Sequence, residues 1–344
     1  LLGVSLAVAA VPEGLPAILS VVLAMGVRRM ARHNAIVKKL ASVETLGSAS
    51  VIASDKTGTL TRGEMTVQRV MTASGRSDFT GVGYTPEGRA ESAGAELPEG
   101  PLRSELHAVL QGGSLAGNAQ LQQDDAGAWT IQGDPTEAAF LVADYKLGKQ
   151  GADEAPPELK ERFERIGEIP FTSQRKMMSV LVVDHANGDA HVLFVKGAPD
   201  VLLAQCTHAR RGEATVALDA TLQAQVLADL AAMTGDALRT LAVARRTLAP
   251  DAQIPDDAVA AAALEQDLEY LGTVGIIDPP REEAAVAIAE ARQAGIRVIM
   301  ITGDHPRTAV RIAADLGIAI TDASAGAPVL TGIELDQLDD AAFT

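Results

Sequence analysis

A short apolar run that stops at an aspartate most constrains what this chain can fold into. Residues 51–54 (Val-Ile-Ala-Ser) lead into Asp55, and Lys-Thr-Gly-Thr-Leu-Thr follows at 56–61. Such a run, ending at a polar turn, predicts a buried parallel strand. Open α/β sheets bind ligands at the carboxyl ends of their strands. The glycine and threonines after Asp55 can offer N–H and hydroxyl groups to an anion. The sequence therefore predicts an α/β fold with Asp55 at its ligand-binding edge.

The chemistry expected at this edge is phosphoryl transfer. A carboxylate presented there can act as a nucleophile and form an aspartyl phosphate. Thr57 stands where haloacid-dehalogenase-type phosphatases carry a second aspartate, which protonates the leaving group and activates water. With threonine at this position, hydrolysis of the acyl phosphate should be slow. The intermediate then lasts long enough to drive a conformational step, with Asp55 as nucleophile and Lys56 and Thr57 beside it.

A second strand is expected at 274–277, where it runs into Asp278-Pro279-Pro280-Arg281. Proline lacks an N–H and fixes its backbone, and it also restricts the residue before it. Two prolines in succession therefore predict a stiff, extended crossing of the kind found at a domain junction.

The residues after this crossing predict a helix at 282–294, a stop at Gly295 and a strand at 296–301 that ends in Thr302-Gly303-Asp304. Strand, helix and strand in this order favour a βαβ unit. That unit would place the Thr302 hydroxyl and the Gly303 N–H beside Asp55, where they stabilise charge on a transferring phosphoryl group. An ordinary turn is the alternative for 302–304.

The first 26 residues contain one ionisable side chain, Glu13, and are otherwise almost entirely apolar. At about 1.5 Å per residue they reach roughly 39 Å, enough to cross a bilayer. Arginines and lysines follow at 28–39, which predicts a cytoplasmic C-terminal end. The chain begins without Met inside this run, so we expect a fragment that lacks its N-terminal part.

Prolines at 12 and 16 should break this helix and free backbone carbonyls. The freed carbonyls of Val8, Ala9 and Val11 beside Glu13 would form an oxygen-rich site suited to a hard cation such as Ca²⁺. A glutamate that caps the kink or reaches the membrane interface is the alternative.

The middle of the chain, residues 64–277, predicts alternating strands and Ala/Leu-rich helices. The expected elements are strands at Ser179–Val183 and His191–Val195 joined through Asn187-Gly188, helices near 222–233 and 257–266, and surface loops at 85–101 and 151–158. Lys196-Gly197 follows a strand and places an ammonium group beside a flexible turn, which suits a nucleotide pocket. An exposed lysine at a strand end is the alternative.

Charge and cysteine content exclude two classes of protein. The chain has 29 basic and 45 acidic residues, a formal net charge of −16, which argues against generic nucleic-acid binding. A single cysteine excludes an internal disulfide framework and a cysteine-based zinc cluster. We read the acidic excess as a solvated face. Arginine outnumbers lysine 21 to 8, which points to a bacterial origin.

Six motifs occur in the order and at the spacing of a P-type cation-transporting ATPase, and the chain most resembles the calcium-pump branch. They are Pro-Glu-Gly-Leu-Pro at 12–16, Ser-Val-Glu-Thr-Leu-Gly at 42–47, the Asp55 motif, Lys-Gly-Ala-Pro at 196–199, Asp-Pro-Pro-Arg at 278–281 and Thr-Gly-Asp at 302–304.

The resemblance implies a haloacid-dehalogenase-like (Rossmann-type) phosphorylation domain split by an inserted α+β nucleotide-binding domain, plus one N-terminal transmembrane helix. The implied boundaries are a helix at 1–26 broken at Pro12–Pro16, a linker and first part of the phosphorylation domain at 27–63, the nucleotide-binding domain at 64–277, and the truncated second part of the phosphorylation domain at 278–344.

The resemblance also implies the roles of individual residues. Phe171 would stack on adenine, with a core aromatic as the alternative, while Glu137 faces the adenine side. The other implied nucleotide-binding residues are Lys176, Lys196, Gly197, Arg239, Asp278 and Arg281; Asp304 joins the catalytic group, and Mg²⁺ is held at Asp55 and Thr57. The chain departs from the sarcoplasmic-reticulum pumps at Ser173, where they carry Arg, and at Gly133-Asp134-Pro135, where they carry Gly-Glu-Ala.

The implied function is ATP-driven cation transport through an aspartyl-phosphate intermediate, in a bacterial inner (plasma) membrane with residues 27–344 cytoplasmic. Ca²⁺ is favoured because Pro-Glu-Gly-Leu-Pro at 12–16 resembles the calcium branch. Sodium/potassium pumps usually show Pro-Glu-Gly-Leu-Leu at this membrane motif. A pump for Na⁺, K⁺, Mg²⁺ or Mn²⁺, a soluble phosphatase of the same core fold, and a non-catalytic nucleotide sensor are the alternatives.

Several parts of the family's pattern are not found in this sequence. They are a further lysine and the Gly-Asp-Gly-x-x-Asn-Asp loop of the phosphorylation domain, the actuator domain with its Thr-Gly-Glu-Ser loop, and the remaining membrane helices. We expect the fragment alone to bind ATP but not to transport.

Overall fold

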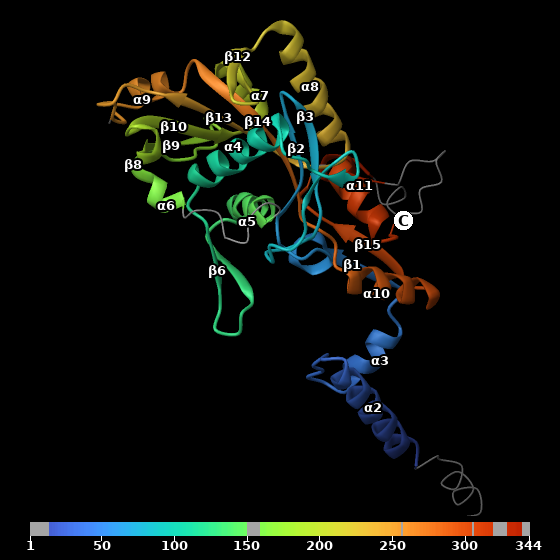
Figure 1. The fold of residues 1–344 in the computed structure, drawn as a ribbon. Helices are drawn as coiled ribbons and strands as arrows, with labels where there is room; N and C mark the ends of the chain where they lie inside the picture. Colours follow the sequence, from blue (N-terminus) through green and yellow to red (C-terminus); the bar gives the residue numbers. More distant parts are fainter. Residues whose placement is uncertain (1–13, 150–158, 256, 305, 319–328, 339–344) are drawn as a thin grey trace, which may run out of the picture. The chain divides into compact units, whose positions relative to one another are not determined.

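The computed structural model describes residues 14–149, 159–255, 257–304, 306–318 and 329–338 (Figure 1). The chain divides into two compact units. One holds residues up to Ser54 together with 286–299, and the other holds 55–285 and 300–344. Each is described separately.

The smaller unit carries two helices and a pair of strands. Its elements are α2 (Leu15–Arg32), α3 (Ala41–Gly47), most of β1 (Val51–Asp55), part of α10 (Glu282–Gln293) and part of β15 (Arg297–Ile301). Pro16 fits the first turn of α2, where an N–H is not needed. Among the described residues, no helix has both the length and the apolar character needed to cross a membrane. Val8, Ala9, Val11 and Glu13 lie outside these residues.

β1 and β15 pair with each other in a two-stranded sheet. The expected strands at 51–55 and 296–301 are therefore confirmed, and Gly295, with φ of +77°, ends α10 as expected. The prediction that β1 is buried is wrong, because Val51 is 49% exposed and Ile52 is 42% exposed. A sheet of two strands offers little surface to cover them, and burial needs further strands or a helix packed on the sheet.

The larger unit is built on one eleven-stranded sheet, with β5-β4-β3-β2-β14-β13-β10-β9-β8 in line and β11 joining β14 to β12. Its strands are β2 (Thr66–Thr72), β3 (Gly75–Phe79), β4 (Ala90–Ser92), β5 (Ala95–Glu96), β8 (Phe163–Ile169), β9 (Met177–Asp184), β10 (Ala190–Gly197), β11 (Cys206–Arg211), β12 (Ala214–Ala217), β13 (Arg239–Thr247) and β14 (Leu268–Ile277). A separate hairpin is formed by β6 (Gln120–Gln123) and β7 (Trp129–Gln132).

Helices cover both faces of this sheet. On one face lie α4 (Pro101–Leu115) and α5 (Pro135–Lys149), and on the other lie α7 (Pro199–Leu202) and α8 (Ala220–Gly235). The unit also contains α6 (Leu159–Arg162), α9 (Ala258–Leu264), α11 (Pro306–Asp315) and α12 (Gly332–Asp336). Asp219 caps α8 by accepting from Leu222 N at 2.9 Å, which satisfies a free helix-end donor.

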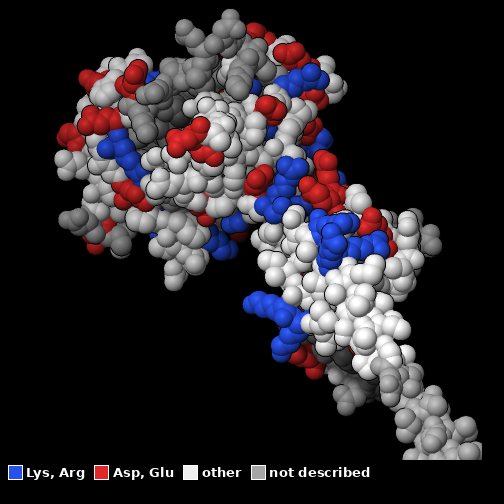
Figure 2. All heavy atoms as spheres, turned by 90° about the horizontal axis from the view of Figure 1, so that it is seen from below, with Lys and Arg blue, Asp and Glu red and all other residues white. Residues whose placement is uncertain are grey.

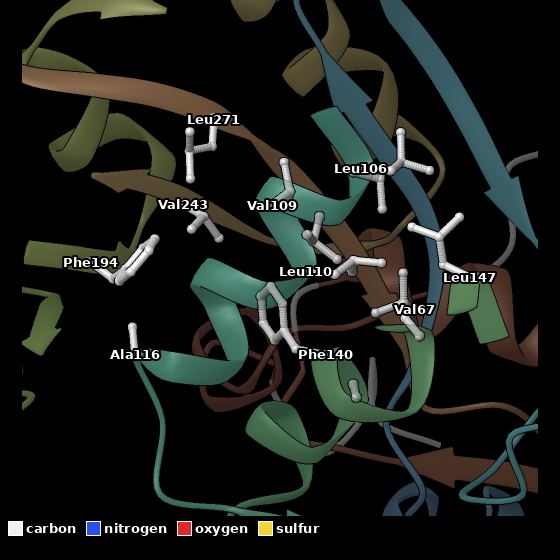
Figure 3. Packing of buried hydrophobic residues seen from close by; sticks show 14 of the residues in the cluster. Val67, Leu106, Val109, Leu110, Ala116, Phe140, Leu147, Phe194, Val243 and Leu271 are labelled. Atoms are coloured by element: carbon white, nitrogen blue, oxygen red, sulfur yellow. The ribbon is translucent and has the colours of Figure 1, made fainter. Parts of the chain in front are cut away.

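Alternation along the strands gives the sheet an apolar surface on each side. On β10, Val192 and Phe194 belong to the core under α4 and α5, whereas Leu193 and Val195 belong to the core under α7 and α8. Figure 3 shows the first core, with Phe140 of α5 against α4 and Phe194 and Leu271 on the sheet. Because both faces are covered, consecutive residues of the central strands are apolar.

Several predicted elements are confirmed. β9 and β10 pair antiparallel in the predicted hairpin, and the helices at 222–233, 257–266 and 282–294 correspond to α8, α9 and α10. The hairpin connection is longer than a two-residue turn: a short helical turn at His185–Asn187 precedes Gly188, whose φ is +63°.

Two predictions about connections are wrong. The segment 85–101 is not all loop, because β4 and β5 pair within it and Ala90 and Leu97 are buried. Strands of three and two residues are too short to leave a periodic sequence pattern. The segment 151–158 lies outside the described residues.

The predicted βαβ unit is also wrong, because β14 and β15 belong to different sheets. β14 pairs antiparallel with β2 and β13, whereas β15 pairs with β1. The physical reason lies in Pro279 and Pro280, which have no N–H for a ladder and end β14 where the chain leaves the large sheet.

Acidic and basic side chains stand side by side over the face of the larger unit that Figure 2 presents. Such mixing is typical of a solvated protein surface.

Candidate functional site

The turn after β1 has a backbone that requires glycine. Asp55 is extended and exposed, and Thr57 (φ −73°, ψ 123°) and Gly58 (φ 73°, ψ −7°) have the two central conformations of a type II turn. A positive φ at the second position strains any residue with a Cβ, so glycine belongs there. The turn leaves Asp55 and Thr57 accessible while the chain reverses direction behind them.

Lys56 points inward, between two aspartates that are distant in the sequence. Its Nζ lies 2.7 Å from Oδ2 of Asp304 and 3.8 Å from Oδ2 of Asp278, and its side chain is 6% exposed. A buried ammonium is stable only when it is paired. Lys56 therefore joins all three predicted phosphate motifs, and each of these residues lies within the larger unit.

Asp278 is the most heavily bonded carboxylate of this group. Oδ2 accepts a hydrogen bond from the hydroxyl of Thr61 at 2.6 Å, and Oδ1 accepts one from the backbone N–H of Gly63 at 2.8 Å. Thr61 is fully buried, and its hydroxyl oxygen accepts from Gly58 N at 3.3 Å. The last threonine of the motif therefore ties the turn to Asp278.

Arg281 links the segment that follows β14 to the turn that follows β1. Its Nε donates to Thr61 O at 2.9 Å, its Nη2 donates to Gly58 O at 3.2 Å, and its backbone N–H donates to Leu60 O at 2.9 Å. The N–H of Arg62 donates to Pro279 O at 3.0 Å. The extended crossing predicted at 278–281 is thus confirmed as one half of a bonded pair of segments.

The motif after β15 forms a small polar turn. The backbone N–H of Asp304 donates to the Thr302 hydroxyl at 3.1 Å. Thr302 and Asp304 are half-buried, and Gly303 is exposed. Asp304 binds Lys56, the next residue after Asp55, so the structure links the 302–304 motif to the nucleophile motif through this ion pair. The placement of the Thr302 hydroxyl and the Gly303 N–H beside Asp55 stays a prediction.

A second polar group lies at the C-terminal end of α4. Lys196 Nζ lies 3.1 Å from Oε1 of Glu137, and Oε2 of Glu137 accepts from Asn118 N at 2.7 Å. Burial lowers the pKa of the Lys196 ammonium below its ordinary value, and the Glu137 carboxylate partly opposes this shift. The predicted alternative, an exposed strand-end lysine, is wrong, because Lys196 is 6% exposed.

The loop before β9 carries the predicted adenine platform. Phe171 is 59% exposed, so the alternative of a core aromatic is wrong. Lys176 is exposed, has a φ of +53° and lies 3.9 Å from Oδ2 of Asp200. A non-glycine residue at positive φ is uncommon and needs surrounding contacts to hold it.

Those contacts come from the loop itself and from Gly197. Lys176 N donates to Thr172 O at 2.7 Å, and Lys176 O accepts from Ala198 N at 2.9 Å. A Cβ on Gly197 would lie 2.7 Å from that same carbonyl oxygen. Gly197 therefore allows the chain after β10 to close on the Phe171 loop.

Strand pairing gathers these residues at one end of the sheet. Gly197 at the end of β10 pairs with Met177 at the start of β9 and with Ala242 near the start of β13. Arg239, the exposed first residue of β13, lies at the same end. The same end of the sheet therefore carries Lys176, Lys196, Gly197 and Arg239.

An arginine that sequence reasoning missed anchors this loop. Arg175 Nη1 donates to Pro170 O at 2.7 Å, and its Nη2 binds the carboxylate of Glu265, which is 2% exposed and also accepts from the Ser179 hydroxyl. Ninety positions separate Arg175 from Glu265. A pair at that separation leaves no local signal in a single sequence.

A family model described as "P-type ATPase, cytoplasmic domain N" matches residues 105–283, more than half of the chain. The chain belongs to the P-type ATPases. It is 42% identical to a calcium-transporting ATPase of Bacillus subtilis over 92% of this chain and 34% of that protein, and 40% identical to the cation-transporting ATPase pma1 of Synechocystis over the same shares.

A mammalian relative is similar as well. The calcium-transporting ATPase type 2C member 1 of Bos taurus is 37% identical over 98% of this chain and 32% of its own length. The chain therefore spans about a third of the length of the curated relatives it matches.

Proposed function

We propose that this P-type ATPase chain is the ATP-binding and phosphorylated part of a pump that transports a cation, most simply Ca²⁺, across a membrane. The observation that carries the proposal is the buried Lys56, which binds Asp304 and approaches Asp278 directly behind the exposed Asp55. The names of several relatives, which are called calcium-transporting ATPases, support the choice of cation, although others are named only as cation-transporting ATPases.

ATP binds at the end of the sheet where Lys196 and Arg239 lie, next to Glu137 of α5, with its adenine against Phe171. The exposed ring offers an apolar face for stacking, and the lysine and arginine offer positive charge to the phosphates. The remaining residues proposed at this edge are Lys176 and Gly197.

Asp55 then attacks the γ-phosphorus of ATP. A bond forms between its carboxylate oxygen and phosphorus, the bond from phosphorus to the β–γ bridging oxygen breaks, and ADP leaves. Lys56 neutralises Asp278 and Asp304, whose charges would otherwise repel the incoming phosphates. The Thr302 hydroxyl and the Gly303 N–H stabilise the transferring phosphoryl group.

Mg²⁺ fits the donors that this turn offers. In phosphoryl-transfer sites Mg²⁺ is held by one or two carboxylates together with substrate phosphates. Within the residues described, no three His, Cys, Asp or Glu side chains gather as a metal site. Asp55 and the neighbouring Thr57 would hold the ion, which supplies charge neutralisation for the phosphates when bound.

Thr57 leaves the acyl phosphate without the second carboxylate that would activate water. We propose that the phosphorylated state therefore persists. Phosphorylation then draws the hydrogen-bonded segments 60–63 and 278–281 closer together. The motion alters a cation site at Glu13 and the carbonyls of Val8, Ala9 and Val11.

We further propose the domain limits given by the resemblance: a membrane helix at 1–26, a linker and first part of a haloacid-dehalogenase-like domain at 27–63, the nucleotide-binding domain at 64–277, and the second part at 278–344. The bilayer, an actuator domain and other membrane helices complete the pump, and residues 27–344 face the cytoplasm of a bacterial cell.

Calcium uptake by vesicles tests this function. Vesicles containing the full-length pump should accumulate radioactive calcium when ATP is added, and Asp55→Asn should abolish uptake while ATP still binds. Uptake of another cation in place of calcium would show that the pump transports that cation. Rapid hydrolysis of phosphate esters without cation stimulation would favour a phosphatase and overturn the proposal.

A further inference from the structure

A cavity of about 780 Å³ opens in the larger unit at the end of α4 opposite to Lys196. Pro101 and Ser104 of the first helical turn line it, whereas Gly117, just past the last turn, lies against Lys196 and Glu137. The fifteen residues of α4 span roughly 22 Å. The lining extends along α4 to Gln111 and reaches Phe194, two positions before Lys196 on β10, but it includes none of the residues proposed to bind ATP. We call this cavity the arginine cleft.

The floor of the arginine cleft is apolar. Phe163 of β8 and Phe194 of β10 meet edge to face, with ring centroids 6.0 Å apart, and Val192 lies beside them. A cavity of this volume is large enough for a small organic molecule. Phe163 and Phe194 are only 7% and 6% exposed, and the Arg162 guanidinium lies 4.7 Å from the centre of the Phe163 ring, so the floor offers a ligand a small apolar contact at the ring edges.

The walls carry positive charge, although the whole chain is acidic. Four arginines line the cleft, Arg103, Arg162, Arg210 and Arg245, against three acidic residues, Glu99, Asp184 and Glu213. Arginine presents planar donors that match the oxygens of phosphate and carboxylate groups.

Three of the four arginines have carboxylate partners. Arg162 binds Asp184 through two bonds of 2.8 Å and holds the pKa of that carboxyl below its ordinary value. Arg245 donates its Nε to Glu269 at 2.6 Å, and Arg103 pairs with Glu99 at 3.1 Å. These carboxylates are therefore neutralised by the protein itself.

Arg210 lacks such a partner. Among the described residues its one hydrogen bond runs from Nη2 to the Ser104 hydroxyl at 3.3 Å, and its Nε is buried with no acceptor. Burial and the neighbouring Arg245 lower the pKa of the Arg210 guanidinium, whereas the nearby carboxylates of Glu269, Glu213 and Glu105 oppose this shift without bonding to Arg210. A buried donor without an acceptor is costly, and an anion in the cleft would supply one.

The first turn of α4 adds further donors beside Arg210. Gly100 precedes the helix, no side chain caps it, and no acidic residue occupies its first turn. Pro101 has no N–H, and Ser104 N donates to Gly100 O at 3.2 Å, so the donors that this turn can offer an anion are the N–H groups of Leu102 and Arg103. The helix dipole also favours an anion there.

We propose that the arginine cleft binds a small organic anion, a phosphate or carboxylate group attached to an aromatic or apolar body. The anionic group bonds to Arg210 and the first turn of α4, and the apolar body lies on Phe163 and Phe194. This inference does not depend on the proposed pump function.

Calorimetric titration of the 344-residue chain tests the proposal with phenyl phosphate and with benzoate, each first without ATP and then in the presence of saturating ATP. Phenyl phosphate and benzoate distinguish the two anionic groups on the same ring. We expect at least one of them to bind, and Arg210→Gln to weaken that binding roughly tenfold or more. Arg210→Lys, which keeps the charge, should weaken it less.

Arg76→Gln is the matched control, because Arg76 lies exposed on β3 and does not line the cleft. Thermal melting verifies that each variant is folded. Failure of both ligands to bind at millimolar concentration, loss of binding when ATP is added, or equal affinity in folded Arg210→Gln would each overturn the proposal.

Discussion

The buried ammonium of Lys56 lies 2.7 Å from Oδ2 of Asp304, which joins the turn after β1 to the turn after β15. This ion pair is the link between two motifs at distant places in the sequence. The second carboxylate near Lys56 belongs to Asp278, which lies where the chain leaves the large sheet. Removing Lys56 would leave two carboxylates without their cation.

Lys56→Gln should therefore lower the free energy of unfolding by about 2–4 kcal/mol, because breaking a buried ion pair leaves an uncompensated charge. Urea unfolding of the chain measures this. Lys38→Gln, at an exposed lysine, should change stability by less than about 0.5 kcal/mol. Equal stability of Lys56→Gln and the wild type would contradict the structural role given to Lys56.

Gly197→Ala should destabilise the chain by about 2 kcal/mol or more. The new methyl group would lie 2.6 Å from Met177 Cγ and 2.7 Å from Lys176 O, so the backbone must move. Gly235→Ala is the matched control, since nothing lies within 4 Å of its Cβ near the end of α8. Differential scanning calorimetry should show a lower melting temperature for the first variant and an equal or higher one for the second.

We expect the free energy of unfolding to depend on pH because of Lys146. Burial lowers the pKa of its ammonium to about 8, and Nζ donates to the carbonyls of Thr80 and Gly81 at 3.0 Å each. Between about pH 8 and the ordinary lysine value, the unfolded chain binds more protons than the folded chain. Stability from this group therefore rises with pH through that window, by up to about 3 kcal/mol.

Lys146→Met removes the titrating group and should flatten this rise. Urea unfolding at pH 7.5 and pH 10 compares the two proteins, and the difference between their pH slopes isolates Lys146. The assignment fails if both proteins gain or lose the same amount of stability between the two values.

Much of this fold was open to sequence reasoning where the signals are local. The β9–β10 hairpin, the end of α10 at Gly295 and the turn after Asp55 each follow from residues within a few positions. The exposure of β1 was not predictable in this way, because burial depends on which other elements pack on a strand.

The site shows the same division. The motifs around Asp55 and Asp304 identified the residues, but not that Lys56 would be the buried link between them. The pair Arg175–Glu265 was missed entirely, because it joins the loop before β9 to the residue after α9. Such contacts depend on the folded topology and leave no periodicity in the sequence.

Glu265→Gln should weaken ATP binding roughly threefold to tenfold, because a loop that is less firmly held must be ordered when the nucleotide binds. Arg175 would keep its bond to Pro170 but lose its charged anchor. Fluorescence titration with a nucleotide analogue, well below the melting temperature, measures the affinity. Glu96→Gln, on the exposed strand β5, is the control. Unchanged affinity in a folded Glu265→Gln protein would rule out this positioning role.

The most direct test of the central claim is phosphorylation of Asp55 in the full-length pump. Incubation with ATP labelled at the γ-phosphate, with and without Ca²⁺, is followed by acid quenching and peptide mapping. The account predicts a cation-dependent, acid-stable and hydroxylamine-sensitive label on the peptide containing Asp55, and none in Asp55→Asn. A label on another residue, or none with any candidate cation, would contradict it.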